Sequence, residues 1–100
     1  MRTMLKFRME VEAANKAARN GILKEVMDQT IKEIKPEATY FTLENGHRTG
    51  MMFFDLKDSS MLPVIAEPLF NRLNAELFIT PVMTEKELAH GLDSWKKSTH

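Results

Sequence analysis

The chain has 100 residues, with 14 basic and 14 acidic side chains, and 43% of its residues are hydrophobic. This length fits one folded domain, and the balanced charge gives no overall field that would attract nucleic acid or an anionic membrane. The absence of cysteine excludes disulfides, thiolate catalysis and cysteine-based metal sites. No apolar run is long enough for a signal peptide or a membrane span, so we expect a cytoplasmic protein with a single domain over residues 1–100.

The first predicted element is a strand over residues 3–10, where side chains on alternate positions differ in polarity. Leu5 and Phe7 fall on one face of this strand. Lys6 and Arg8 fall on the other face. The second face of the sheet is therefore expected to carry positive charge at this strand.

A helical pattern of apolar residues follows over residues 11–35. Asn20 and Gly21 interrupt it, and both residue types tolerate the left-handed backbone conformation. We therefore expect a kink there, or two helices in place of one. Pro36 ends the pattern because proline cannot continue the hydrogen-bond ladder of a helix.

Asn45 and Gly46 separate two predicted strands, over residues 38–43 and 48–56, and this pair of residues is a strong hairpin signal. The second of these strands contains an apolar run over residues 51–54, so both of its faces are apolar. A strand of this kind is typical of the middle of a sheet that is covered on both sides. The second face of the sheet is thus expected to be shielded from bulk water.

A second helical pattern runs to about Leu73, after side-chain oxygens in residues 58–60 that can cap a helix. Pro63 fits the first turn of this helix. Pro68 should kink the helix or delay its start, because proline has no N–H to donate.

The last strand is predicted over residues 75–82. Residues 84–87 have the pattern of a capping box, which predicts a short helix ending near Leu92. We expect Trp95 to anchor this last helix, and the chain from about residue 96 to be frayed.

The order of elements, β-α-β-β-α-β, predicts an α+β, ferredoxin-like fold with a four-stranded antiparallel sheet and both helices on one face. Sorting each strand by polarity assigns its residues to the two faces of the sheet. The face under the helices should hold Leu5, Phe7, Phe41, Leu43, Met52, Phe54, Leu77 and Ile79. The opposite face should hold Lys6, Arg8, Tyr40, Thr42, Met51, Phe53, Asp55, Phe78 and Thr80.

That opposite face would expose Tyr40, Met51, Phe53 and Phe78 together, an apolar patch larger than monomers usually tolerate. A second copy can cover it through a symmetric interface between the two sheets. Burying several hundred Å² on each partner would contribute about 10 kcal/mol before the cost of association. The sequence therefore predicts a homodimer.

Several segments, spread over nearly the whole chain, resemble small bacterial proteins of the dimeric α+β barrel superfamily. They are Lys35-Pro36-Glu37-Ala38-Thr39-Tyr40-Phe41, Arg48-Thr49-Gly50 and the run Glu67-Pro68-Leu69-Phe70-Asn71-Arg72-Leu73-Asn74-Ala75 leading to Thr80-Pro81-Val82-Met83-Thr84. The resemblance implies a dimeric α+β barrel. It implies no activity, because the group resembled has none established. The wider superfamily includes cofactor-independent monooxygenases, muconolactone-isomerase-like enzymes, haem-binding proteins and plain ligand binders, and fold alone does not choose among them.

Lys6 and Arg8 are the main candidates for a functional site, because two cations in a half-buried cavity can bind a carboxylate or an enolate. The alternative is that they form ion pairs with Asp55, Glu76 or Glu10, within one chain or across the dimer. Tyr40, Met51, Phe53 and Phe78 would then shape the walls of the cavity.

No other residues form a recognisable site. The three histidines, His47, His90 and His100, match no metal-ligand spacing, and none is expected on the cavity face. Glu67, before Pro68, is read as a solvated helix carboxylate, with a functional acid as the alternative. Neither a metal nor a cofactor is predicted.

Two functions remain open at this point. In the first, the protein binds a small organic molecule, such as an anion, between its paired sheets, and it either acts on this molecule without a cofactor or only binds it. Alternatively, side chains fill the interior and the protein is a structural or protein-interaction module. No catalytic constellation decides whether it is an enzyme.

Overall fold

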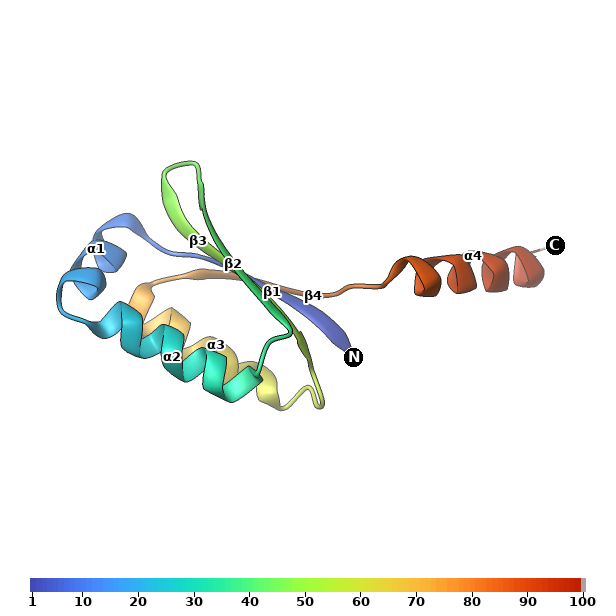
Figure 1. Ribbon diagram of the computed structural model, residues 1–100, viewed down its shortest axis with the longest axis horizontal. Coiled ribbons are helices and arrows are strands. Elements are labelled where there is room, and N and C mark those ends of the chain that lie inside the picture. Colours follow the sequence, from blue (N-terminus) through green and yellow to red (C-terminus); the bar gives the residue numbers. More distant parts are fainter. Residues whose placement is uncertain (100) are drawn as a thin grey trace.

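A computed structural model describes residues 1–99 and places four strands and four helices in them (Figure 1). In chain order the elements are β1 (Arg2–Arg8), α1 (Val11–Arg19), α2 (Ile22–Ile34), β2 (Ala38–Glu44), β3 (His47–Asp55), α3 (Met61–Leu73), β4 (Glu76–Pro81) and α4 (Glu85–Thr99). The strands form one antiparallel sheet in the order β2-β3-β1-β4. The α+β class and the four-stranded antiparallel sheet are confirmed, and the arrangement is compatible with a ferredoxin-like fold.

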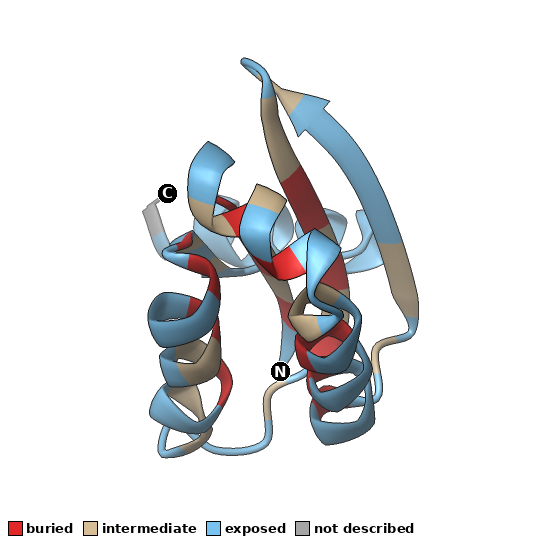
Figure 2. Ribbon diagram, turned by 90° about the vertical axis from the view of Figure 1, so that its left-hand side faces the viewer, coloured by how far each residue is buried: buried red, intermediate tan, exposed pale blue. Residues whose placement is uncertain are grey.

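The predicted break in the first helical segment divides it into α1 and α2. Gly21 has a φ of 81°, a left-handed conformation that glycine adopts without steric cost. Just before it, the Asn20 side chain accepts a hydrogen bond from the Ile22 N–H at 3.0 Å. These two residues end one helix and begin the next. The helices α1, α2 and α3 all lie on the same side of the sheet (Figures 1 and 2).

The predicted hairpin joins β2 to β3. Asn45 and Gly46 have φ angles of 50° and 80°. Positive φ at both central residues is the requirement of the two-residue turn whose twist matches that of the strands. This turn sets the register of β2 against β3, with Glu44 opposite His47.

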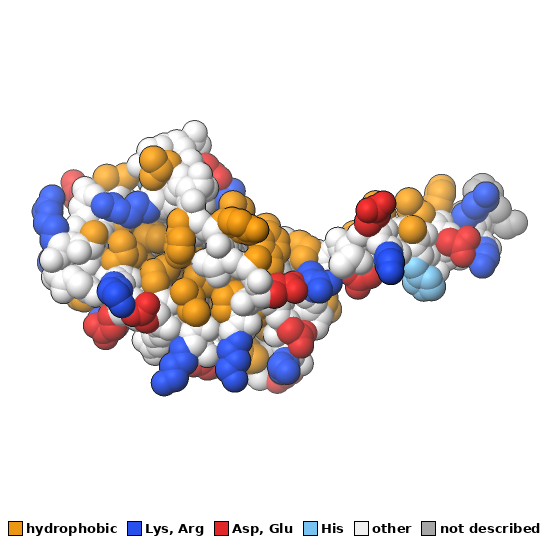
Figure 3. Space-filling model, in the orientation of Figure 1, with side chains coloured by type: hydrophobic (Ala, Val, Ile, Leu, Met, Phe, Trp, Pro, Cys, Tyr) orange, Lys and Arg blue, Asp and Glu red, His pale blue; other side chains and the backbone are white. Residues whose placement is uncertain are grey.

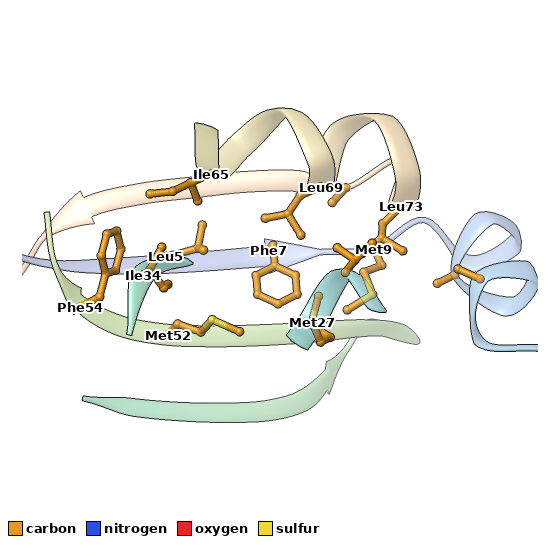
Figure 4. Close-up of a cluster of buried hydrophobic side chains, with 14 residues drawn as sticks. Leu5, Phe7, Met9, Met27, Ile34, Met52, Phe54, Ile65, Leu69 and Leu73 are labelled. Atoms are coloured by element: carbon orange, nitrogen blue, oxygen red, sulfur yellow. The ribbon is translucent and has the colours of Figure 1, made fainter. Parts of the chain in front are cut away.

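The core lies between the sheet and the helices α1, α2 and α3 (Figure 4). Leu5 and Phe7 of β1 are fully buried at its centre. Gly50 of β3 lies opposite Phe7, and a Cβ atom at this glycine would lie 2.3 Å from the Cζ atom of the ring. The ring therefore packs in a place that only glycine leaves open. The core comprises Leu5, Phe7, Met9, Ala14, Ala17, Val26, Met27, Ile34, Met52, Phe54, Ile65, Leu69, Leu73 and Ala75.

The edge strand β2 contributes no side chain to this core. Phe41 and Leu43 were predicted to lie under the helices, but their side chains are 57% and 75% exposed. Both side chains are nevertheless on the same face of the sheet as Phe7. Phe41 and Phe7 both lie opposite Gly50, and Leu43 is two residues beyond Phe41. The prediction of burial is wrong because the helices pack over β1, β3 and β4 and leave the β2 edge uncovered (Figure 4).

The start of α3 also differs from the prediction. Ser60 precedes the helix with a helical backbone (φ −64°, ψ −15°), and its side chain makes no capping hydrogen bond. Its hydroxyl instead donates to the Asp58 carboxylate. Pro68 lies inside α3, so it does not delay the start of the helix.

The predicted capping box begins α4. The Thr84 N–H donates to Glu87 Oε1 at 2.7 Å, and the Glu87 N–H donates to Thr84 Oγ1 at 3.2 Å. The helix does not end near Leu92: it continues to Thr99, so residues 96–99 are helical where a frayed tail was expected. Figure 1 shows α4 extending away from the sheet and the other helices, which gives the molecule extents of 58 × 28 × 19 Å.

Candidate functional site

The predicted site residues lie together on the face of the sheet that α1, α2 and α3 leave uncovered, which we call the open face. The strand register places Tyr40, Met51, Lys6 and Phe78 directly opposite one another in a single row across all four strands. Phe53 belongs to the neighbouring row. The sequence sorted these residues onto one face, and the register now makes four of them lateral neighbours.

The apolar members of this row are accessible in the single chain. Tyr40 and Phe78 are 60% and 47% exposed, and Met51 and Phe53 are half-buried. We predicted that both faces of β3 are covered. The helices cover the face that holds Met52, which is buried. The open face would have to be covered by another molecule.

Two basic and two acidic side chains form a charge cluster at one end of the open face: Lys6, Arg8, Glu44 and Glu76. Lys6 Nζ lies 2.5 Å from Glu44 Oε2, and Arg8 Nη1 lies 3.2 Å from Glu44 Oε1. Arg8 also contacts Glu76 Oε2 through Nη2 at 2.5 Å and Nε at 3.0 Å. Glu44 bridges the two cations, and the formal charge of the cluster is zero.

These contacts shift the pKa values of the cluster in the expected directions. The hydrogen bond from Lys6, followed by the nearby positive charges, holds the pKa of the Glu44 carboxyl below its usual value. The hydrogen bond to Glu76 raises the pKa of the Arg8 guanidinium above its usual value. Both shifts favour the charged forms of the Glu44 carboxylate and the Arg8 guanidinium.

Of the three alternative ion-pair partners, the single chain pairs one with Arg8, and the other two contact other groups within it. Arg8 pairs with Glu76, as expected for directly opposite residues in β1 and β4. Asp55 instead lies 2.6 Å from the Met1 amino group, at the far end of β1. Glu10 caps α1, because its carboxylate accepts from the Glu12 and Ala13 N–H groups.

Glu44 was not predicted as an ion-pair partner of Lys6 and Arg8. This residue ends β2, and its side chain shares the open face with those of Tyr40 and Thr42. Counting alternate positions from Tyr40 would have reached it. The predicted end of the strand at residue 43 excluded it.

Lys6 differs from Arg8 in how fully its charge is matched. Arg8 contacts two carboxylates, whereas Lys6 contacts Glu44 and lies 5.6 Å from the centre of the Phe78 ring. An ammonium over an aromatic ring is attracted electrostatically. Lys6 is thus the cation of the cluster that an additional anionic group can most easily share.

The histidines and the remaining candidate residues form no second site. His47 opens β3 and its Nδ1 lies 3.0 Å from the Met9 carbonyl oxygen, while His90 is exposed on α4. His100 lies outside the described residues. Within residues 1–99 no three histidine, aspartate or glutamate side chains are placed to hold a metal ion. Glu67 is exposed on α3.

An apolar hollow lies on the other side of the sheet, between α2 and the edge strand β2, and we call it the α2–β2 groove. It has a volume of about 350 Å³. Its walls include Met9, Leu23, Met27, Phe41, Leu43 and Arg48. Figure 3 shows hydrophobic side chains gathered between these two elements. The groove was not predicted, because Phe41 and Leu43 were expected to lie in the core.

Comparison of the chain with protein-family models, curated proteins and solved structures gives no match in any of the three. The resemblance to dimeric α+β barrels therefore stays a prediction from the sequence. Among the helices of residues 1–99, none has the length and hydrophobicity that crossing a membrane requires.

Proposed function

We propose that the protein is a homodimer that pairs its open faces as a dimeric α+β barrel and holds a small organic molecule between the two sheets. The observation that carries the proposal is the row of Tyr40, Met51, Lys6 and Phe78 across the open face. Aromatic and thioether side chains in this row are accessible although they belong to the same sheet as the core. Apolar groups gathered on one face favour burial by a partner.

The charge cluster fits a covered face. Burying an isolated charge costs several kcal/mol of free energy, whereas burying a charge that already has an ion-pair partner costs less. Both Lys6 and Arg8 have carboxylate partners within their own chain. A second sheet can therefore cover the cluster without leaving a cation unmatched.

The same contacts favour one class of ligand. Because Glu44 and Glu76 neutralise the cations, the site has no surplus positive charge that would attract a strongly anionic molecule. We expect an amphipathic carboxylic acid whose carboxylate shares Lys6 with Glu44. Its apolar body would lie against the aromatic side chains of Tyr40 and Phe53.

The neutral cluster also favours a second candidate, a structural dimer without a ligand. In that case the four paired charges and the apolar row fill the space between the sheets. The protein would then act by contacting another protein. No residues are assigned to catalysis under either candidate.

A ligand screen on the dimer separates the two candidates. The melting temperature is measured with panels of aromatic and aliphatic carboxylic acids and of their neutral amides, for the wild type and for Lys6→Met. Lys24→Met is the matched control, because Lys24 forms an exposed ion pair with Asp28 on α2. A ligand should raise the melting temperature of the wild type and the control, and should raise that of Lys6→Met less.

Two results would contradict the ligand proposal. One is that no acid or amide raises the melting temperature of the wild type. The other is that Lys6→Met and Lys24→Met respond equally to every acid that does. A dimer that shows either result supports the structural candidate.

A further inference from the structure

The helix α4 carries an apolar stripe whose side chains are about half exposed. Leu88 and Leu92 are 46% and 54% exposed, and Trp95, which continues the stripe, is 59% exposed. The spacing of four and three residues puts these side chains on one side of the helix. Asp93 and Lys97, which pair with each other, lie on the opposite side. The helix is therefore amphipathic.

A helix of this kind needs a surface to pack against. It has 15 residues, with Gly91 in its middle, and helices of about this length are marginal in water without tertiary packing. Most helical stability in proteins comes from burying an apolar stripe. In this chain α4 lies apart from the sheet and the other helices (Figure 1), and Leu88 and Leu92 of its stripe are exposed.

Several local contacts fix the position of the start of α4. The Val82 N–H donates to the Arg2 carbonyl, which extends the pairing of β4 with β1 beyond Pro81. The capping box of Thr84 and Glu87 then begins the helix, and Glu87 lies 3.8 Å from the Arg2 guanidinium. These contacts hold the first turn of α4 at the end of the sheet where β1 begins.

The chain's own α2–β2 groove lies at the opposite end of the sheet from the start of this helix. Pro81 pairs with Thr3 at one end of β1, whereas the groove residue Met9 follows the other end. The distance along the strand is about 20 Å, and β2 lies three strands away from β4. The connection over residues 82–84 spans at most about 10 Å.

We propose that α4 docks its apolar stripe into the α2–β2 groove of a second copy of this chain. The groove is apolar, opens at the uncovered edge of the sheet and has exposed Phe41 and Leu43 on its wall. A helix from outside can enter it without disturbing the core. Glu85 near the start of the stripe can meet Arg48 at the groove, since Arg48 has no ion pair within the described residues.

The contact area is sufficient for a stable dimer when it occurs twice. A stripe of two leucines and a tryptophan presents on the order of 400 Å² of apolar surface. With the matching groove surface and two reciprocal contacts, a symmetric pair buries about 1,600 Å², the size of a standard specific interface. This contact requires a second copy, but it does not require pairing of the open faces or a ligand.

Disulfide trapping tests the contact, because the native chain has no cysteine and every disulfide must join introduced residues. One preparation carries Leu92→Cys in α4, and a second, of different mass through a tag, carries Leu43→Cys in the groove. Mixing them under mild oxidation should give the mixed disulfide. The control mixture replaces Leu92→Cys with Lys97→Cys, on the opposite side of α4, and should give at least tenfold less.

Further mixtures identify other placements of α4. Preferential disulfides of Leu92→Cys with itself would mean that two α4 helices pair, and preferential disulfides with Phe53→Cys would mean that α4 covers an open face. A double variant, Leu92→Cys with Leu43→Cys, that closes within one chain would mean that α4 folds back. Each of these results overturns the proposal.

A second measurement does not depend on cysteine chemistry. Leu88→Asp with Leu92→Asp should raise the dimer dissociation constant at least tenfold in sedimentation equilibrium, whereas His90→Asp on the charged side should leave it within twofold. Far-UV circular dichroism and cooperative unfolding establish that each variant is folded, since none of these residues belongs to the core. An unchanged dissociation constant in the double variant overturns the proposal.

Discussion

At the scale of single residues, Gly50 is the glycine where an added side chain would have the least room. A Cβ atom there would lie 2.3 Å from Phe7 Cζ, and the Phe7 ring is fully buried at the centre of the core. We expect Gly50→Ala to lower the free energy of unfolding by about 1–3 kcal/mol, as is typical of overpacked cores. Urea unfolding measures this change.

A compensating substitution tests the cause. Phe7→Leu alone should also destabilise the protein, because it leaves a cavity. If the clash with the ring causes the loss, the double variant should be more stable than the sum of the two single changes predicts. Strict additivity of the two changes would contradict this explanation.

The charge cluster predicts a dependence of stability on pH. The pKa of the Glu44 carboxyl is lower in the folded protein than its ordinary value of 4.5, mainly because Lys6 hydrogen-bonds to the carboxylate. A depressed pKa contributes stability that is fully present above the ordinary value and is lost as the pH falls through the folded pKa. Stability should therefore be insensitive to this group near pH 7 and should fall below about pH 4.5.

Glu44→Gln isolates the contribution of this carboxyl. The variant should be less stable than the wild type at pH 7, and the difference between them should shrink as the pH falls below about 4.5. Glu67→Gln is a suitable control, because Glu67 is exposed on α3 and makes no ion pair within residues 1–99. Parallel stability curves for the wild type and Glu44→Gln would contradict the assignment.

At the scale of elements, the strands and most helices could be predicted because their signals are local. Alternating polarity located the strands, Asn20-Gly21 located the break between α1 and α2, and Asn45-Gly46 located the hairpin. The exposure of Phe41 could not be predicted in this way. Its polarity places it on the helix side, but only packing decides how far α2 extends over the sheet.

The same distinction applies to the candidate site. Alternation was enough to place Lys6 and Arg8 on the open face with the four apolar residues. Their ion-pair partners depend on strand register, which alternation does not determine. Glu44 was missed because the predicted strand ended one residue before it, and the full length of α4 was missed because residues 93–99 carry mostly polar side chains.

The beginning of α4 offers a prediction about one element. Thr84 and Glu87 exchange two hydrogen bonds that satisfy backbone N–H groups at the helix start. Thr84→Ala should cost about 1 kcal/mol of helix stability. Hydrogen exchange of the amides in residues 87–90 should become faster, while that of β1 amides should not change. Equal protection of α4 in both proteins would contradict a capping role.

At the scale of the whole molecule, the chain carries two separate apolar surfaces that its own fold does not bury. One is the open face, with Tyr40 and Phe78, and the other is the stripe of α4, with Leu88 and Leu92. A second copy brings a matching open face and an unfilled α2–β2 groove. Under the two proposals made above, a symmetric dimer would cover both surfaces.

The pairing of open faces predicts a dimer that a single charge can disrupt. Phe53 is half-buried on the open face and would become fully buried between two sheets. Phe53→Asp would then place an unpaired carboxylate in the interface, which costs several kcal/mol unless the interface opens. We expect sedimentation equilibrium to give this variant a dimer dissociation constant at least tenfold that of the wild type.

The control must make the same chemical change outside both proposed interfaces. Phe70 on α3 is 44% exposed and lies on neither the open face nor the α2–β2 groove, so Phe70→Asp should remain dimeric. The melting temperature adds a second readout, since only a dimer that unfolds to monomers shows a melting temperature that rises with protein concentration. The wild type and Phe70→Asp should show the same dependence, whereas Phe53→Asp should need a higher protein concentration to reach a given melting temperature. A wild type that sediments at 11.5 kDa, the mass of one chain, would rule out pairing of the open faces.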